Sequence, residues 1–185
     1  NSAVVVSNLA KSFGGVMAVQ HISFQVKRGE LFGFLGPNAA GKTTTIRMLT
    51  GVIKPDEGTA SIFGYDILRE GLKTRQLMGI VPEMANAYVD LSAWNNIMLI
   101  GELYRVPKKE RQERANNLLK DFGLYERKNH LVKGFSKGMK QKLLLCMALI
   151  SEPQILFLDE PTSGLDVASQ RIIKEKIREF NKRGT

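Results

Sequence analysis

The chain has 185 residues, a length that suits one substantial core with a small inserted subdomain. A hydrophobic content of 43% excludes a disordered chain, and no apolar run approaches the ~18 residues of a membrane-spanning helix. The formal charge of +9 suits an anionic partner such as a nucleotide, a nucleic acid or a membrane surface, although a solvated basic surface also accounts for it. The single cysteine, Cys146, excludes an internal disulfide, and its apolar neighbours predict a core position.

Periodicity along the chain predicts its secondary structure. Apolar runs bounded by turn residues predict β-strands, the later ones buried, at Val4–Val6, Leu31–Leu35, Gly79–Val81 and Ile155–Leu158. Helical spacing predicts helices at Lys42–Gly51, Ser92–Tyr104, Lys108–Phe122, Ser136–Ile150 and Ser169–Asn181. Gly51 is expected to end the first of them. A strand, a glycine-rich loop, a helix and a later apolar strand that ends in acids are typical of an α/β fold with parallel strands.

The stretch LGPNAAGKTT, residues 35–44, carries the strongest local signal. Gly36, Gly41, Lys42 and Thr43 fit the phosphate-binding pattern G-x-x-x-x-G-K-S/T between an apolar run and a helix. Backbone N–H groups of such a loop point into one hollow, and the helix N-terminus adds positive potential. We expect Lys42 to reach the outer phosphates of a nucleotide and the Thr43 hydroxyl to ligate Mg²⁺. The alternative is an ordinary glycine turn.

A second signal is ILFLDEPTSGLD, residues 155–166, in which two acids follow four apolar residues. Ligands of open α/β sheets bind at the carboxyl ends of the strands. We expect Asp159 to hold Mg²⁺ and Glu160 to polarise the water that attacks the γ-phosphate, because phosphoryl transfer needs mainly positioning and charge neutralisation. The alternative is a surface acid pair at a strand end.

With these two signals, further motifs make the chain resemble the nucleotide-binding domain of ATP-binding-cassette (ABC) transporters, in the branch of drug and sodium exporters. GFSKGMKQKL at residues 134–143 resembles the family's signature loop, and SGLD at residues 163–166 resembles its D-loop. GIVPE at residues 79–83 lies where the family has its glutamine loop. KSFGGVMAV at residues 11–19 resembles the start of the domain, with Phe13 as the aromatic residue that stacks on adenine.

The resemblance implies a P-loop NTPase core with a largely parallel sheet, an N-terminal antiparallel β subdomain and a helical insert. It implies ATP and Mg²⁺ as cofactors, with Glu160 as the catalytic residue. The implied nucleotide-binding residues are Phe13, Gly36, Pro37, Asn38, Ala39, Ala40, Gly41, Lys42, Thr43 and Thr44. The implied metal ligands are Thr43, Glu83 and Asp159, and the signature residues that contact ATP of a second subunit are Ser136, Lys137, Gly138 and Met139.

The resemblance also implies domains and partners. Residues 1–85 would hold the β subdomain and the phosphate loop, residues 86–134 the helical insert, and residues 135–185 the signature helix, acidic strand and D-loop. Two such domains would form a head-to-tail dimer in which Asp166 organises the opposite subunit. The insert would meet transmembrane domains at the cytoplasmic face of the cell membrane. Trp94, Tyr88 and Met98 are candidates for that contact or for the core, and no direct nucleic-acid binding is expected.

Several positions depart from the family's pattern. Ala39 replaces a glycine, and if that position has a positive φ, alanine costs roughly 1 kcal/mol and weakens ATP binding. Glu83 replaces the loop glutamine, which favours an exporter, and Lys137 replaces a signature glycine, adding charge near phosphate or pointing to solvent. His21 and His130 do not match, by order, the switch histidine on a strand after the D-loop helix. We therefore expect a chain that lacks its C-terminal strand and hydrolyses ATP weakly or not at all.

Taken together, the sequence predicts the ATP-hydrolysing subunit of a membrane transporter, an exporter, that is driven by ATP-dependent dimerisation. One alternative is a cytosolic ABC ATPase that acts on ribosomes or DNA. The charge of +9 would suit it, although the chain shows neither tandem cassettes nor an inserted coiled coil. The other alternative is a degenerate module that holds ATP without turnover, which Ala39 favours and Glu160 opposes.

Overall fold

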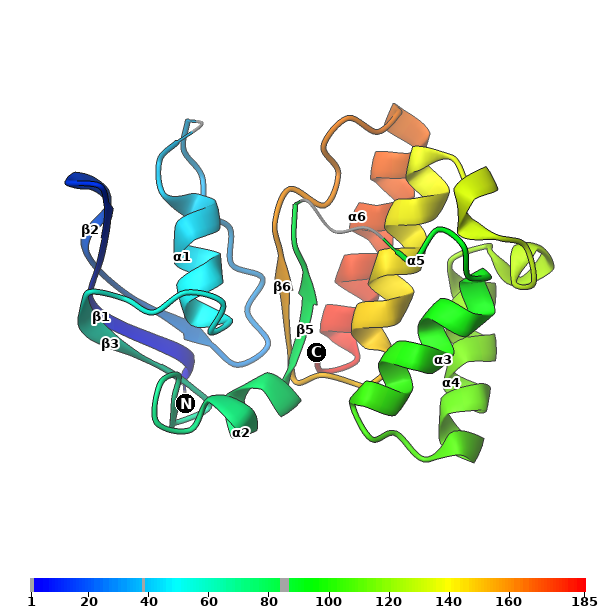
Figure 1. Cartoon of the computed structure of the whole chain (residues 1–185), viewed down its shortest axis with the longest axis horizontal. Helices are drawn as coiled ribbons and strands as arrows, with labels where there is room; N and C mark the ends of the chain where they lie inside the picture. The colour runs from blue at the N-terminus through cyan, green and yellow to red at the C-terminus, as the bar shows by residue number, and fades with distance from the viewer. Residues whose placement is uncertain (1, 38, 84–86) are drawn as a thin grey trace. The chain divides into compact units, whose positions relative to one another are not determined.

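A computed structural model describes residues 2–37, 39–83 and 87–185 of the chain (Figure 1). The chain divides into two compact units, residues 1–78 and residues 79–183. The domain boundary expected between residues 85 and 86 falls outside the described residues. Over the described ranges, no helix is both long enough and apolar enough to cross a membrane.

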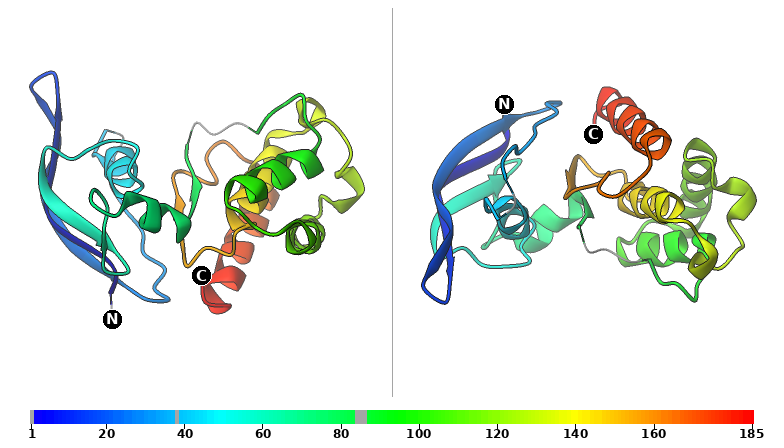
Figure 2. Two further views of the ribbon diagram at one scale, coloured as in Figure 1. Left: turned by 60° about the horizontal axis from the view of Figure 1, so that its bottom comes forward. Right: turned by 90° about the horizontal axis from the view of Figure 1, so that it is seen from above.

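The first unit is built on a four-stranded antiparallel sheet (Figures 1 and 2). Its strands are β1 (Ser2–Phe13), β2 (Val16–Lys27), β3 (Glu57–Ile62) and β4 (Tyr65–Asp66), in the order β2-β1-β3-β4. Gly14 and Gly15, with φ of 55° and 82°, join β1 to β2 in the left-handed geometry of a two-residue hairpin turn. The antiparallel β subdomain is therefore confirmed, although apolar runs had located only Val4–Val6 of β1.

Two helices complete the first unit, α1 (Lys42–Leu49) and α2 (Gly71–Gln76). Helix α1 contacts β2 and lies against one face of the sheet (Figure 2). It buries Thr45, Met48 and Leu49. Gly51 has φ of 72°, a left-handed conformation that ends the helix as the sequence predicted.

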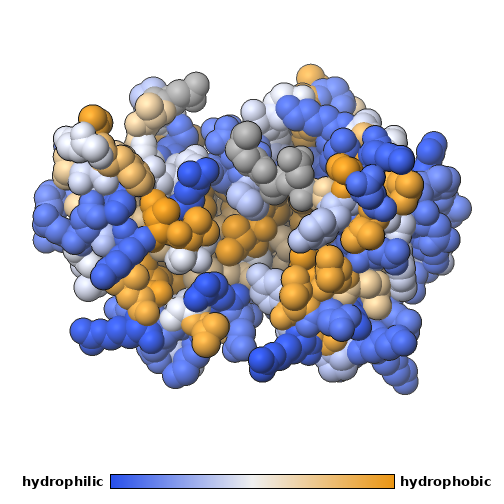
Figure 3. Space-filling model, in the orientation of Figure 1, coloured by the Kyte–Doolittle hydropathy of each residue, from blue (hydrophilic) through white to orange (hydrophobic). Residues whose placement is uncertain are grey.

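The strand predicted at Leu31–Leu35 is wrong, because this segment has no regular secondary structure. Apolar residues form a strand only when a neighbouring strand completes the hydrogen-bond ladder, and no described strand pairs with this segment. Three aromatic rings pack there instead, with centroids 5.4 Å apart for Phe24 and Phe32 and 5.3 Å for Phe32 and Phe34. Leu35 is 97% exposed, and apolar side chains reach the surface of both units (Figure 3).

The second unit combines a two-stranded sheet with helices. Its strands, β5 (Met78–Val81, which begins at the unit boundary) and β6 (Ile155–Leu158), lie side by side and run in the same direction (Figure 1). The sequence predicted both, but β6 is half-buried rather than buried. It pairs with β5 alone among the described strands, so no described strand continues the sheet at its other edge.

The helices of the second unit are α3 (Ala93–Leu103), α4 (Lys108–Asp121), α5 (Lys137–Leu149) and α6 (Val167–Lys182), with short 3-10 helices η1 (Tyr125–Arg127) and η2 (Val132–Gly134). These bounds confirm the predicted helices to within one or two residues at each end. Helix α6 begins earlier than predicted because the Asp166 side chain caps it. Helix α5 supplies most of its residues to the core, and Cys146 is fully buried there as expected.

Candidate nucleotide-binding site

The start of α1 has the geometry of an anion site. Gly41 precedes the helix with φ of 81°, and as a glycine it has no side chain with which to cap the helix. A Cβ atom at Gly41 would collide with the carbonyl oxygen of Ala18, so only glycine allows the loop to approach β2 this closely. The N-terminus of α1 carries positive potential, which suits an anionic ligand beside the loop.

Lys42 folds back over the loop that precedes it. Its Nζ atom donates hydrogen bonds to the carbonyl oxygens of Gly36 and Pro37, at 2.8 Å each. Phosphate oxygens would offer the same ammonium charged acceptors, which make shorter and stronger hydrogen bonds than neutral carbonyls. The Lys42 ammonium thus lies at the loop that precedes α1.

Ala39 has φ of 64°, so the position does need the left-handed conformation that alanine disfavours. The positive φ on which the expected cost of alanine at position 39 depended is therefore present. The strain amounts to roughly 1 kcal/mol. Its neighbour Ala40 has an ordinary negative φ. Asn38, also predicted to bind nucleotide, lies outside the described residues.

Ala39→Gly should stabilise the chain by about 0.5–1 kcal/mol and tighten or leave unchanged its affinity for ATP, because glycine relieves the strain at positive φ. Thermal unfolding with and without Mg-ATP measures both effects. Ala40→Gly is the matched control, and we expect it to destabilise slightly, because only backbone entropy changes there. A clear loss of ATP affinity in Ala39→Gly would contradict this account of the position.

The predicted adenine-stacking residue lies in the same unit as the phosphate loop. Phe13 ends β1, pairs with Val16 across the hairpin and is 51% exposed. Lys11 Nζ lies over its ring, 5.4 Å from the centroid. Strand β2 pairs with the end of β1 that carries Phe13, and Ala18 of the same strand lies against Gly41. Strand β2 therefore lies next to both the Phe13 ring and the phosphate loop.

The predicted acids gather at the carboxyl end of the sheet in the second unit. Asp159 follows β6, is buried, and donates its backbone N–H to the Val81 carbonyl oxygen of β5 at 2.9 Å. Glu83 leaves the same end of β5 and is exposed. Glu160 is exposed and has φ of 51°, a strained conformation of the kind that gathers at functional sites.

The described residues hold no group of three or more His, Cys, Asp or Glu side chains placed to bind a metal ion. Thr43, half-buried in the first turn of α1, belongs to the first unit, whereas Glu83 and Asp159 belong to the second. Mg²⁺ prefers a few protein oxygens together with substrate phosphates and water over an all-protein cage. An oxygen ligand of either unit would therefore suit magnesium that is carried by a nucleotide.

The signature segment opens α5 as predicted. The Ser136 side chain caps the helix by accepting a hydrogen bond from the Met139 N–H at 3.2 Å. Gly138 approaches α6 so closely that an added Cβ would lie 2.7 Å from the Ser169 hydroxyl oxygen. Lys137 is exposed, and its Nζ would collide with a Cβ at Gly164, so the ammonium lies beside the predicted D-loop.

Asp166, the predicted D-loop residue, caps α6. Its carboxylate accepts hydrogen bonds from the Ser169 N–H at 2.8 Å and from the Ser169 hydroxyl at 2.7 Å. These bonds, the hydroxyl first, lower the pKa of the carboxyl below its usual value. Because Ser169 also meets Gly138, the starts of α5 and α6 form one packed structure.

Of the three candidates for a membrane-domain contact, Trp94 and Met98 pack half-buried against the core, and Tyr88 is 55% exposed. Asn96, which was not among the predicted site residues, holds Tyr88. Its buried amide accepts from the Tyr88 N–H at 2.8 Å and donates to the Tyr88 and Ser92 carbonyl oxygens at 3.0 Å. A polar residue on the apolar stripe of a predicted helix was the signal that could have found it.

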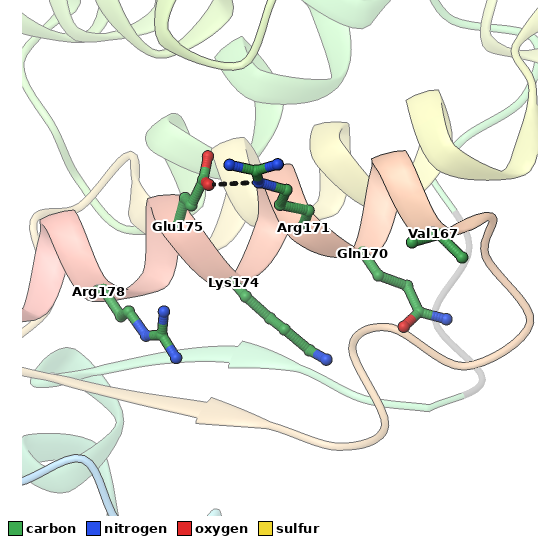
Figure 4. A pocket seen from close by; sticks show the side chains of 6 residues that line it. All are labelled: Val167, Gln170, Arg171, Lys174, Glu175 and Arg178. Atoms are coloured by element: carbon green, nitrogen blue, oxygen red, sulfur yellow. Dashed lines mark hydrogen bonds and ion pairs between the residues drawn. The ribbon is translucent and has the colours of Figure 1, made fainter.

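A hollow runs along α6, and none of the predicted nucleotide-binding residues lines it. Arg171 and Glu175 form an ion pair on this helix, at 2.9 Å. Lys174 and Arg178 project from it separately (Figure 4). The six lining residues all come from α6 and are Val167, Gln170, Arg171, Lys174, Glu175 and Arg178. The hollow is thus a basic surface of one helix and not the nucleotide site.

Comparisons with known proteins agree on one family. A family model described as ABC transporter matches residues 19–163. The linearmycin resistance ATP-binding protein LnrL of Bacillus subtilis (strain 168) is 40% identical over 177 residues, which are 96% of this chain and 57% of that protein. The daunorubicin/doxorubicin resistance ATP-binding protein DrrA of Streptomyces peucetius is 36% identical over 183 residues, 99% of this chain and 56% of that protein.

A comparison of structures agrees. The solved structure of an ATP-binding subunit of an ABC transporter is similar with a TM-score of 0.89 and 30% identity, over 100% of this chain and 77% of that one. This likeness confirms the P-loop α/β fold with its antiparallel β subdomain. The chain spans little more than half the length of the two resistance proteins.

Proposed function

Because this chain belongs to the ABC transporter family, we propose that it is the ATP-binding and ATP-hydrolysing subunit of a membrane exporter. The start of α1 is the observation that supports the proposal most. Gly41 brings the loop against β2, and Lys42 turns its ammonium into the loop beside the N-terminus of α1. This arrangement suits the β- and γ-phosphates of a nucleoside triphosphate.

In the proposed reaction Lys42 neutralises the outer phosphates and Phe13 stacks on adenine. Mg²⁺, held by Thr43, Asp159 and Glu83 together with phosphate oxygens, would neutralise the charge that develops on the β- and γ-phosphates. Glu160 orients the attacking water and accepts its proton. The water oxygen forms a bond to the γ-phosphorus while the bond from that phosphorus to ADP breaks.

We further propose a head-to-tail dimer. The signature residues of one subunit, Ser136, Lys137, Gly138 and Met139, would contact the γ-phosphate held by the other subunit. The N-terminus of α5 carries positive potential there, and the Lys137 ammonium beside Gly164 adds to it. Asp166 would organise the opposite subunit through its place at the start of α6.

The export proposal rests on the relatives and on one substitution. Two relatives are named for resistance to linearmycin and to daunorubicin/doxorubicin, which supports outward transport of a compound of that kind. Glu83 in place of the loop glutamine agrees with an exporter. Transmembrane partner domains would meet the helical insert, near Tyr88, at the cytoplasmic face of the cell membrane, and no nucleic acid takes part.

Calorimetric titration of the 185-residue chain with Mg-ATP tests the nucleotide site, and vesicles with the complete protein and its membrane partner test transport. We expect saturable, magnesium-dependent binding, and ATP-dependent uptake of drug into inside-out vesicles. A folded chain that does not bind ATP would refute the proposal. Binding without any turnover or transport in the complete system would indicate an ATP-binding module instead.

A further inference from the structure

We propose that Asp56 is a positioning residue for adenine recognition. Through Lys11 and Ser12 it holds the end of β1 so that Phe13 presents one ring face to the base. The inference rests on the proposed function, since it concerns the base of the bound ATP. Asp56 matches no motif in the sequence, and it lies 45 positions from Lys11.

The Asp56 carboxylate binds both residues that precede Phe13. Its Oδ1 atom accepts a hydrogen bond from Lys11 Nζ at 2.6 Å. Its Oδ2 atom accepts from the Ser12 N–H at 2.8 Å and from the Ser12 hydroxyl at 3.1 Å. The Asp56 N–H donates to the Ala10 carbonyl oxygen at 2.9 Å, which fixes the carboxylate relative to the same strand.

The sheet explains why β1 needs this carboxylate. The ladder between β1 and β3 ends at the pair Ala10 and Glu57. From Lys11 onward, β1 pairs only with β2, in the pairs Lys11–Val19, Ser12–Met17 and Phe13–Val16. Beyond the ladder, the Ser12 N–H would need another acceptor, and Asp56 supplies it in place of a strand. The side chain thus extends the sheet to the residue before Phe13.

Lys11 carries this restraint to the aromatic ring. Its side chain is only 17% exposed, and its Nζ lies between the Asp56 carboxylate and the Phe13 ring, 5.4 Å from the ring centroid. The attraction between a cation and the face of an aromatic ring holds the ring in place. A base that stacks on a ring already held in place binds more tightly, because less conformational freedom is lost on binding. One ring face is therefore taken by the ammonium, and the exposed part of Phe13 remains for a base.

Asp56 stays ionised wherever ATP binding would be measured. The hydrogen bond from Lys11, followed by those from Ser12, lowers the pKa of Asp56 to about 2. Because the folded pKa lies below the ordinary value, this carboxylate contributes stability above about pH 4 and loses it only as the pH falls through about 2. Assays at about pH 6 to 8 thus all report the charged form.

Two ligands separate base positioning from phosphate binding: Mg-ATP and magnesium tripolyphosphate, which has the phosphates and no base. We expect Asp56→Ala in the full chain to weaken ATP about 5- to 20-fold, close to the effect of Phe13→Ala, since stacking of one base accounts for that range. Tripolyphosphate affinity should change less than about twofold. The double variant Asp56→Ala/Phe13→Ala should lose no more ATP affinity than Phe13→Ala, because both act through one ring.

Glu57→Ala is the matched control, because its carboxylate is the next in sequence and lies 3.8 Å from His21, whereas Lys11 and Ser12 donate their hydrogen bonds to Asp56. It should leave both affinities unchanged. Asp56→Asn, which keeps an acceptor for Ser12 and loses the ion pair, should weaken ATP by less than Asp56→Ala. This milder variant serves the test if circular dichroism shows Asp56→Ala to be unfolded.

Equal losses of ATP and tripolyphosphate in folded Asp56 variants would overturn the proposal, because they would show a general effect on the loop. Unchanged ATP affinity, or full additivity with Phe13→Ala, would overturn it as well. Failure of the proposed function gives a different result, since the wild-type chain would then bind neither ligand.

Discussion

Lys42→Ala should weaken ATP binding about 100-fold or more, so that the remaining affinity is too low for a routine titration to measure. The Lys42 ammonium lies at the loop. Its loss would remove the proposed charge-assisted hydrogen bonds to the phosphates, which are worth about 1.5–3 kcal/mol each. At about 1.4 kcal/mol for each factor of ten, two such bonds account for the expected loss. The measurement is a calorimetric titration with Mg-ATP and with magnesium tripolyphosphate, and both affinities should fall together.

The same substitution also removes the bonds from Lys42 to the Gly36 and Pro37 carbonyl oxygens, so the unliganded loop should loosen. Thermal unfolding without nucleotide measures that effect separately from binding. Arg47→Ala is the control, because Arg47 is an exposed cation on the same helix, α1, in its last turn. Unchanged ATP affinity in Lys42→Ala, with Arg47→Ala also unchanged, would refute the phosphate role of Lys42.

Glu160→Gln should lower ATP turnover of the complete protein about 10²- to 10⁴-fold, the range of a lost general base. Glutamine keeps the size of the side chain and its ability to orient water, but it cannot accept the proton. Binding of Mg-ATP should survive, because in the proposed site Lys42 and the start of α1, and not Glu160, hold the phosphates. The ATP-bound dimer should therefore accumulate, and size-exclusion chromatography with Mg-ATP would detect it.

Glu152→Gln is a closely matched control for this experiment. Glu152 lies before β6 in the same unit, is exposed, and has φ of 52°, against 51° for Glu160. Its partner is Arg114, at 3.0 Å on the surface, and such pairs contribute little to stability. We expect normal turnover in Glu152→Gln. Normal turnover in Glu160→Gln would show that another group activates the water.

The sequence by itself determined the features that depend on neighbouring residues. Ser92 and Ser136 cap α3 and α5 because a serine side chain accepts from the N–H three residues later, wherever the helix lies in the fold. The phosphate loop was predicted for the same reason. Glycine at position 41 permits the left-handed turn, and the helix begins at the next residue.

Tertiary structure decided which apolar segments became strands where composition misled. Leu31–Leu35 has the composition of a buried strand, yet it remains irregular because no described strand pairs with it. Val16–Lys27 has weaker apolar character and forms β2, because β1 pairs with it along its length. Strand formation depends on hydrogen bonds between distant segments, and composition does not report them.

The candidate site shows the same division. Lys42, Asp159 and Glu160 stood out because each lies at a fixed spacing from its neighbours in a recognisable motif, and Phe13 stood out through the resemblance to the family. Two features needed the fold. Ala39 was a conditional expectation until its φ of 64° showed the strain, since the loop conformation depends on the approach of the loop to β2. Asp56 and Lys11 meet across 45 positions because β3 returns beside β1, and local spacing carries no trace of such a contact.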